Sequence, residues 1–514
     1  MSRPGYVLEV DDRTPPLVVP DGDGFRLERF PLGTKVVYPA ESHAPVVDVR
    51  EAINACLDSP LDSDPLSARL WAGMKLTIAF DDISSPLPRM RPPDIRGRII
   101  EAVLSRAAKA GVDEVSLVCA RGLNRRMTEP ELQHLLGERV FRSFFPDGRL
   151  LHHDAEDPEN LSSIGRTDDG EIRINAAAAS ADLLVFVHIA APTSGGAHAV
   201  ATGLGSAATI SQLSAHPDGA GGRPSQNDLL AQHVSAALNI FQIEAVLNND
   251  VFAPPLQFLA RREWEWSIKD QATWLGLRRG LALTSAKTRR RLLNAAQAGY
   301  APIQIAAGDP AAVTHASQVK VLAQQVVEVG GQTDVGIIGV AHGTPYSVNS
   351  VTNPILAAWM GLGSTFNAHT GQPVVRQGGA LILYHPMPEN FSGLHHPSYI
   401  DFFADVLTTT TEPGQIQEKF EAKFASDPWY THLYRSSYAF HGVHPLHRWY
   451  QLATARAHCG DIIWVGAHRP SVERLGFRAA STLADALEIV SSTVGRTPSI
   501  TYLHSPPPLV ADVR

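Results

Sequence analysis

A strand, a helix and a second strand follow one another in the first quarter of the chain, and this order strongly limits the possible folds. Residues 75–80, KLTIAF, are apolar enough for a buried strand. Asp94 can cap the helix that follows, in which the apolar residues Ile95 and Ile99 recur at helical spacing. Residues 114–120, EVSLVCA, return as a strand. Such a unit predicts parallel strands in one sheet that is covered by helices.

Polar residues follow both strands and are candidates for a functional site. Asp81 and Asp82 come directly after the first strand, and residues 121–126 form the loop after the second. Ligands of open parallel sheets bind outside the carboxyl ends of the strands. We therefore expect these strand ends to converge on one region. Turn and cap chemistry before Ser84 is the alternative role for the two aspartates.

A third strand end lies within residues 181–198, ADLLVFVHIAAPTSGGAH. Its apolar part delivers His188, and the turn of Ser194, Gly195 and Gly196 follows. Glycine lets a backbone approach a ligand closely, because it has no Cβ. The run therefore indicates either a strand that presents a histidine to a ligand-binding loop, or a strand that ends at a surface loop with an incidental histidine.

The length of the chain predicts more than one domain, since 514 residues exceed what one hydrophobic core usually organises. Helical structure is expected from the loop at residues 217–226 to about residue 300. A second α/β region is expected to begin near Ile303. We therefore predict two α/β domains, residues 1–295 and 296–514, with largely parallel sheets and a cleft between the domains.

Composition narrows the classes of function. The net charge of -8 and the lack of a dense basic run argue against nucleic-acid binding. Three widely spaced cysteines without a C-x-x-C motif fit a reducing compartment and no thiolate metal site. The N-terminus lacks a signal-peptide pattern, and no apolar stretch reaches membrane-spanning length. We expect a cytoplasmic protein that acts on a small molecule, without nucleic-acid or membrane partners; the oligomeric state is not predicted.

The chain has 21 histidines, which raises the question of metal binding. His441, His444 and His447 recur every third residue, a spacing that spreads them over about 120° of a helix and disfavours joint ligation. Pro445 is expected to disrupt that helix further. These residues either line the cleft between the domains or are surface and capping histidines, and we favour the second interpretation. In the cleft interpretation, three further histidines would line the same cleft: His385, His395 and His396.

Five motifs along the chain occur in a characteristic order. They are DDISSP at 81–86, ARGLNRRMTEPEL at 120–132, HHDAEDPENLSSIGRTDDG at 152–170, the run at 181–198 and GFRAASTLADALEIV at 476–490. The first is similar to an Asp-x-Thr-Arg-Pro pattern, and the second to Ala-Thr-Gly-Thr-His-Arg-Pro-Met-Thr. Together they resemble the lactate racemase family, the nickel-pincer-dependent racemases and epimerases of 2-hydroxy acids, over most of the chain.

The resemblance implies a hydride mechanism. In the family, one of two histidines takes the hydroxyl proton while a hydride moves from the substrate carbon to a nickel-bearing, nicotinate-derived cofactor. A lysine links this cofactor to the protein, and a further histidine binds nickel. His188 matches one catalytic histidine. The residues that the resemblance assigns to cofactor binding are Asp81, Asp82, Ser84, Ser194, Gly195, Gly196 and His198.

Several positions depart from the family pattern. Asn124 stands where the second catalytic histidine belongs, and an amide cannot accept a proton near neutral pH. His198 stands where the linking lysine belongs; an imidazole cannot form that linkage, although it could bind a metal. Ser85 replaces an arginine that would clamp an anion. The position of the nickel ligand falls at Ser214, and His216 lies two residues further on.

We therefore predict an isomerase-type enzyme that acts on a 2-hydroxy acid, with sugar acids as one candidate class. His188 would be the acid/base, Asn124 and Arg125 would orient the substrate, and His198 and His216 are the candidate metal ligands. A nickel pincer, if used, would be bound without the lysine linkage. One alternative is a binding protein that has lost nickel chemistry. Another is an enzyme with an ordinary divalent metal held by His188, His198 and a nearby carboxylate.

Overall fold

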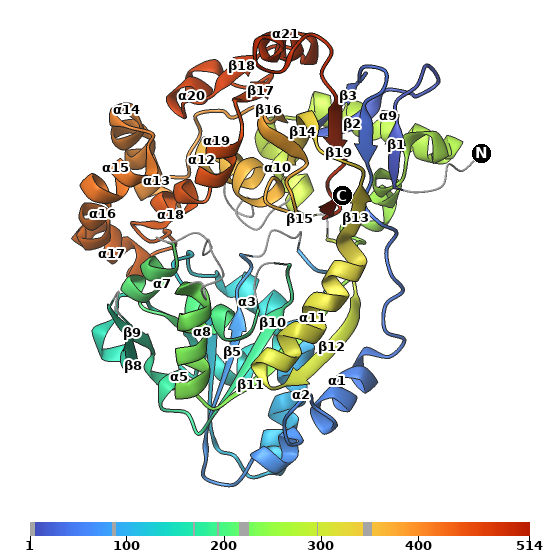
Figure 1. Cartoon of the computed structure of the whole chain (residues 1–514). Helices are drawn as coiled ribbons and strands as arrows, with labels where there is room; N and C mark the ends of the chain where they lie inside the picture. The colour runs from blue at the N-terminus through green and yellow to red at the C-terminus, as the bar shows by residue number, and fades with distance from the viewer. Residues whose placement is uncertain are drawn as a thin grey trace.

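Two mostly parallel β-sheets organise the chain, one of six strands and one of nine. They lie in the lower and the upper half of Figure 1. The computed structural model of the protein describes residues 6–84, 89–167, 170–192, 195–214, 226–295, 297–342 and 352–514. Helices pack on both sheets, so the predicted α/β class with largely parallel strands is confirmed.

The first sheet contains the predicted strand–helix–strand unit. Its strands, in spatial order, are β12 (Pro302–Gly308), β11 (Ile240–Leu247), β10 (Leu183–Ile189), β5 (Lys75–Asp81), β6 (Glu114–Ala120) and β7 (Leu150–His152). Neighbouring strands run parallel except β12, which is antiparallel to β11. The crossover between β5 and β6 is α2 (Ile95–Lys109), whose N-cap Asp94 accepts a hydrogen bond from the Arg96 N–H.

Helices cover both faces of this sheet, and alternate strand residues point to opposite faces. Ile78 and Phe80 pack in the cluster on the side of α2, whereas Ala79 and Phe186 pack in the cluster on the other side. The helices around the sheet are α1 (Val49–Asp58), α5 (Ala176–Ala179), α6 (Gly196–Leu204), α8 (Gln226–Ala237) and α11 (Pro310–Gln325). By this alternation, Asp81 and His188 belong to the face that α6 covers.

The expectation of helical structure up to residue 300 is wrong at β11. This segment, IFQIEAVL, is buried at every position because strands flank it and helices cover it. A strand buried on both faces lacks the alternation of apolar and polar residues that marks a half-buried strand. The helical expectation holds further on, in α9 (Ile268–Leu283) and α10 (Ala286–Ala295).

The second sheet is built mainly from the C-terminal part of the chain. Its main path is β1 (Val7–Glu9), β4 (Lys35–Val37), β19 (Ile500–Leu503), β14 (Thr333–Ala341), β16 (Val375–Tyr384), β17 (Asp461–Val465) and β18 (Arg478–Ala480). The hairpin of β2 (Leu17–Gly22) and β3 (Gly24–Glu28) joins it at β14. The expected closing helix is α21 (Leu483–Val494), which begins at a capping box of Thr482 and Asp485.

Strand pairing does not follow the predicted division at residues 295 and 296. The N-terminal strand β4 pairs with β19, with Val37 opposite Leu503, so the start of the chain belongs to the second sheet. Conversely, β12 lies after the predicted boundary but pairs with β11 of the first sheet. Each predicted half therefore contributes strands to the sheet of the other half.

A helical segment between β16 and β17 contacts the first half of the chain. It includes α13 (Pro397–Asp401), α16 (Ala422–Ser426), α17 (Pro428–Ser436), α18 (His444–Tyr450) and α19 (Ala453–His458). In Figure 1, α17 and α18 lie beside α7 (Ala207–Ser214) of the first half, and α18 contacts α7. This segment brings residues far apart in the sequence to the loops of the first sheet.

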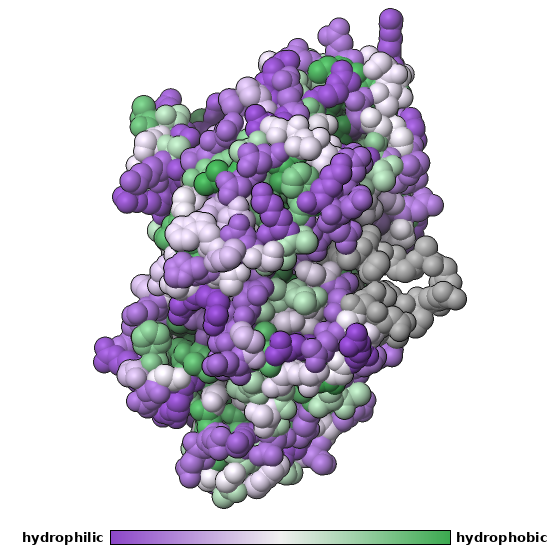
Figure 2. Space-filling model, turned by 90° about the vertical axis from the view of Figure 1, so that its left-hand side faces the viewer, coloured by the Kyte–Doolittle hydropathy of each residue, from purple (hydrophilic) through white to green (hydrophobic). Residues whose placement is uncertain are grey.

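No helix in the described part of the chain combines the length and the apolarity needed to cross a bilayer. Figure 2 shows one face of the molecule, on which hydrophilic and hydrophobic residues are interspersed in small patches.

Candidate active site

Three neighbouring parallel strands place polar side chains in a row near their carboxyl ends. β5 ends at Asp81, β10 carries His188, and β11 carries Glu244. His188 and Glu244 are register partners across β10 and β11. All three side chains belong to the face that α6 covers, since Ala79 and Phe186, two residues earlier, pack on that side. The predicted convergence of strand ends therefore occurs, with Glu244 as an additional member.

Asp81 and His188 form a buried pair. The Nδ1 atom of His188 lies 3.1 Å from Oδ2 of Asp81, which also accepts a hydrogen bond from the Ile189 N–H. His188 is 7% exposed. Burial alone would raise the pKa of the Asp81 carboxyl, but the attraction of His188, the charge of Arg96 and the Ile189 hydrogen bond together outweigh burial and lower this pKa. Asp81 is thus an ionised partner whose negative charge stabilises a protonated His188 ring.

Asp82 has different surroundings from Asp81. Its Oδ1 accepts a hydrogen bond of 2.8 Å from the Ser84 N–H, and its carbonyl oxygen accepts one of 2.6 Å from Arg96. Burial raises the pKa of Asp82 to about 6. Arg96 is itself paired with Asp94, the cap of α2. Asp82 and Ser84 therefore form a turn that connects the strand end to α2, which matches the alternative role predicted for them.

Glycines 195 and 196 approach another part of the chain closely. Gly196 has φ +55°, and a Cβ there would lie 2.8 Å from Oγ1 of Thr314 on α11. The Gly196 N–H donates to Oε1 of Glu244 over 3.2 Å, and the Thr314 hydroxyl donates to the same oxygen over 3.0 Å. Glu244 thus caps the start of α6, where a helix favours negative charge. Ser194, predicted beside these glycines, lies outside the described residues.

His198 lies in the first turn of α6 and is half-buried. Its neighbours Ala197 and Ala199 are buried in the core beside the sheet. Within the described residues, no three side chains of histidine, cysteine, aspartate or glutamate come together as a metal site, so His188, His198 and a carboxylate do not form one. His216 and Ser85 are outside the described residues.

The loop after β6 places two predicted substrate-orienting residues. Oδ1 of Asn124 lies 3.1 Å from Nε2 of His444 on α18, a residue 320 positions away. Arg125 is buried, and its guanidinium makes two hydrogen bonds to the carboxylate of Glu131, of 2.8 and 3.0 Å. The fork of Arg125 that would match a substrate carboxylate therefore already has a carboxylate partner in the chain.

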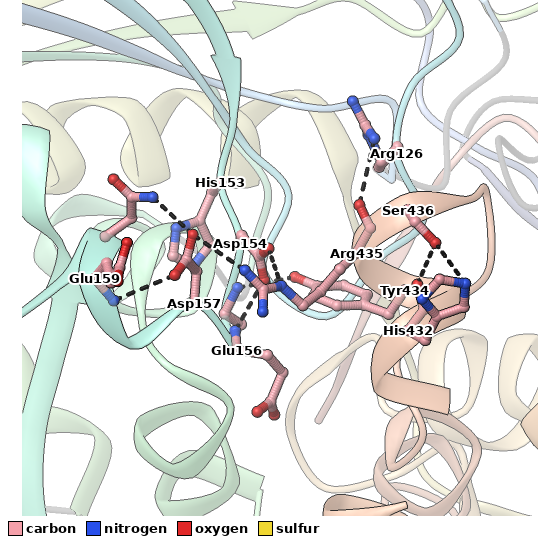
Figure 3. A network of polar contacts seen from close by, with 12 residues as sticks. Arg126, His153, Asp154, Glu156, Asp157, Glu159, His432, Tyr434, Arg435 and Ser436 are labelled. Carbon is pink, nitrogen blue, oxygen red and sulfur yellow. Dashed lines mark hydrogen bonds and ion pairs between the residues drawn. The ribbon is translucent and has the colours of Figure 1, made fainter. Parts of the chain in front are cut away.

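The same loop is held by α17. The side chain of Arg121 stacks on the ring of Tyr434 at 3.9 Å, and the Tyr434 hydroxyl donates to the carbonyl of Gly122 over 2.5 Å. Figure 3 shows the neighbouring network, in which Arg435 pairs with Asp154 at 2.8 Å and with Asp157 at 3.2 Å. The carboxyl edge of the first sheet is thus bounded by the helical segment of the second half.

The predicted surface location of the histidines is wrong. All six are at most 5% exposed: His385, His395, His396, His441, His444 and His447. Pro445 does not disrupt α18, because it occupies the first turn, where a missing N–H has no partner to lose. His441 pairs with Glu156 at 2.8 Å, and His444 reaches Asn124. Several of these residues therefore connect the two halves of the chain.

A cavity of about 790 Å³ opens between the two halves. Its walls include Glu156, Arg173 and Ser211 from the first half and Gln417 and Glu421 from the helical segment. Among the described residues, those around His188 do not contribute to its lining. The cavity is thus separate from the row of Asp81, His188 and Glu244.

Sequence reasoning missed Glu244 and Thr314, and it considered His444 only as a cleft or surface histidine. Glu244 lies on the strand that was expected to be helical, so its position beside His188 could have been found only by recognising β11. The contact of His444 with Asn124 joins residues 320 positions apart, for which the sequence contains no local signal.

Comparison with known proteins identifies a matching domain and a shared fold. Residues 25–216 match the lactate racemase N-terminal domain. The whole chain resembles the lactate racemase apoprotein from Thermoanaerobacterium thermosaccharolyticum, with a TM-score of 0.60 and 16% identity, over 96% of this chain and 99% of that one. It also resembles the crystal structure of a protein from Thermotoga maritima, with a TM-score of 0.50 and 11% identity, over 92% and 100%. No curated protein matches the sequence significantly.

The matched segment is similar to a lactate racemase N-terminal domain, and the chain shares its α/β fold with a lactate racemase apoprotein. Position 198 of this chain is a histidine. The residues present do not fit a lysine-linked nickel pincer. An imidazole has no primary amine for the linkage.

Proposed function

We propose that the protein is an isomerase-type enzyme that moves the hydrogen at the α-carbon of a 2-hydroxy acid, with His188 as its acid/base. The buried pair of Asp81 and His188 is the observation that carries this proposal. An ionised carboxylate at Nδ1 holds the ring in one tautomer and stabilises the imidazolium that forms when Nε2 takes a proton. The matched domain and the fold support the same class of reaction.

Because Asn124 replaces the second histidine, only one face of the substrate would meet a base. A base on each side is needed if both configurations are to react in the same way, and an amide can orient a substrate oxygen but cannot take its proton. We therefore propose unequal reaction of the two configurations, as in an epimerase with a preferred direction, rather than symmetric racemisation.

A nickel-pincer nucleotide, if the protein uses one, is proposed to bind without a covalent bond to residue 198. The test is to co-express the protein with cofactor-maturation enzymes, then to measure bound nickel and the intact mass. Bound nickel with an unmodified protein mass supports this proposal. A pincer-sized covalent adduct would contradict it. A stoichiometric metal that is lost in His198→Ala, without a pincer, would instead favour an ordinary divalent metal.

The reaction itself can be tested with 2-hydroxy acids deuterated at the α-carbon, including both lactate enantiomers and a set of sugar acids. Nuclear magnetic resonance would follow inversion of the α-carbon and loss of its label. We expect inversion of at least one substrate by the wild type and none by His188→Gln, which keeps the size of the side chain. The idea fails if no substrate is inverted and none loses its label.

A binding protein is the second candidate, and the pairing of Arg125 with Glu131 favours it. In an active site of this kind, a buried arginine would be expected to serve the substrate carboxylate instead. Calorimetric binding of a 2-hydroxy acid with no change at its α-carbon would identify the protein as a binding homologue.

A further inference from the structure

A chain of three side chains connects the second half of the protein to Asn124, the residue proposed to orient the substrate. The hydroxyl of Tyr399 lies 2.6 Å from Nδ1 of His444, and Nε2 of His444 lies 3.1 Å from Oδ1 of Asn124. Tyr399 and His444 are 0% and 3% exposed. The ring of His444 also stacks on Phe440, with ring centroids 4.5 Å apart. This packing leaves the imidazole little freedom to rotate.

The chemistry of the three groups fixes the direction of their hydrogen bonds. The amide oxygen of Asn124 can only accept, so Nε2 of His444 must donate. A neutral imidazole then has an unprotonated Nδ1, which accepts from the Tyr399 hydroxyl. Burial lowers the pKa of His444 well below its ordinary value, and the nearby positive charge of Arg448 acts in the same direction. The ring is therefore neutral, with its proton on Nε2.

These hydrogen bonds determine what the Nδ2 group of Asn124 can do. When Oδ1 is held by His444, the Nδ2 group points away from it, because the two atoms diverge from one planar carbon. An NH₂ group is a pure donor. It suits a carboxylate or carbonyl oxygen of a ligand and does not suit a hydroxyl that must give up its proton.

We infer that Tyr399 and His444 are positioning residues that hold the Asn124 amide so that it acts on the substrate as a hydrogen-bond donor, and thereby select a carboxylate or carbonyl oxygen at this position. The inference rests on the proposed function for its meaning in catalysis. The hydrogen-bond directions follow from the structure alone, so they can be tested separately.

The direct test is the tautomer of His444 in the full-length protein labelled with ¹⁵N-histidine. Long-range proton–nitrogen spectra distinguish a proton on Nε2 from one on Nδ1, and the loss of one set of signals in His444→Gln assigns the residue. We expect a proton on Nε2 of His444. His188 is the internal control, since Asp81 at Nδ1 predicts the opposite tautomer there. A proton on Nδ1 of His444, or on both nitrogens at neutral pH, would overturn the inference.

Two variants then separate positioning from folding. Glutamine can place an amide N–H where Nε2 lies, so His444→Gln should keep the KM near that of the wild type. His444→Leu should raise the KM about tenfold, with a smaller change in kcat, since one hydrogen bond to the substrate oxygen is weakened. Equal KM values in the two variants, both with wild-type melting temperatures, would refute the positioning role.

The two hypotheses fail in different ways. If no 2-hydroxy acid reacts, the proposed reaction is wrong, and the tautomer of His444 still decides the hydrogen-bond directions. If turnover depends on His188 while the tautomer is the opposite one, the reaction stands and the positioning chain does not.

Discussion

At the scale of single residues, two adjacent aspartates meet opposite conditions. Asp81 faces His188 on the side of α6, and this partner lowers the pKa of its carboxyl despite burial. Asp82 is more deeply buried, with 3% exposure, but its carboxylate accepts a hydrogen bond from a turn, and burial raises its pKa to about 6. One step along a strand therefore separates a group suited to orient a base from a group suited to hold a turn.

Asp81→Asn should lower kcat about 10²- to 10⁴-fold in a protein that still folds. Asparagine keeps the shape of the side chain, but it removes the charge that stabilises the protonated His188 ring. Steady-state rates with the best substrate would measure the effect. Asp82→Asn is the matched control, expected to stay within about threefold of the wild type because it does not contact His188. Similar losses in both variants would contradict the role of Asp81.

The same two variants should have opposite effects on stability. The raised pKa of Asp82 means that ionisation costs folding free energy as the pH rises from about 4 to about 6, so Asp82→Asn should stabilise at pH 7 by about 2–3 kcal/mol. The lowered pKa of Asp81 has the reverse sign: its stabilisation is present above the unfolded pKa and is lost as the pH falls through the folded pKa. Melting temperatures of both variants from pH 3.5 to 8 would test this, and equal shifts would contradict it.

At the scale of elements, the start of α6 depends on contacts from two other elements. Gly196 adopts a left-handed conformation against Thr314 of α11, while Glu244 of β11 binds its N–H. Neither contact could be predicted from the run at 181–198 alone. The strand and the glycine turn are visible in the sequence, but the residues that require the glycines, Glu244 and Thr314, lie 48 and 118 positions after Gly196.

Gly196→Ala should therefore destabilise the protein by about 1–3 kcal/mol, because alanine disfavours this φ and its Cβ meets Thr314. Thermal unfolding would measure the change. Gly276→Ala is a matched control in the middle of α9, where nothing lies within 4 Å of the added carbon. It should stabilise by about 0.5–1 kcal/mol. An unchanged melting temperature in Gly196→Ala would mean that the turn tolerates a side chain.

Much of the first sheet could be predicted, because its strands and their polar ends follow local patterns. The strand ending at Asp81 and the strand delivering His188 are examples. β11 was missed because a fully buried strand has no alternation, and Glu244 was missed with it. The partner of Asn124 was not predictable, since His444 lies 320 positions away and depends on how the two halves pack.

At the scale of the whole molecule, both halves hold the loop that carries Asn124. Its backbone follows β6 of the first sheet, and the side chain of Tyr434 on α17 contacts both Arg121 and Gly122. The pairs of Arg435 with Asp154 and Asp157 lie beside this contact. The position of this loop therefore depends on contacts between the two halves of the chain.

Tyr434→Leu should loosen this loop without unfolding either sheet. It removes the stack on Arg121 and leaves the Gly122 carbonyl without its donor, so amide hydrogen exchange in residues 121–126 should become at least about tenfold faster. Mass spectrometry of peptides would measure the change. Trp429→Leu is the control on the same helix, since Trp429 is 60% exposed. Uniform acceleration across the protein in Tyr434→Leu would instead indicate global destabilisation.

The pairing of β4 with β19 has a consequence for how the protein is made. A ribosome releases the segments of the first sheet by residue 308, whereas β4 emerges near residue 35 and meets its partner only after residue 503 has been synthesised. β4 can pair with β1 as soon as both have been synthesised, but its other edge must stay unpaired through most of translation. An unpaired strand edge is prone to wrong pairing between chains. Slow synthesis or a truncated message should thus yield aggregates that begin at the N-terminal strands.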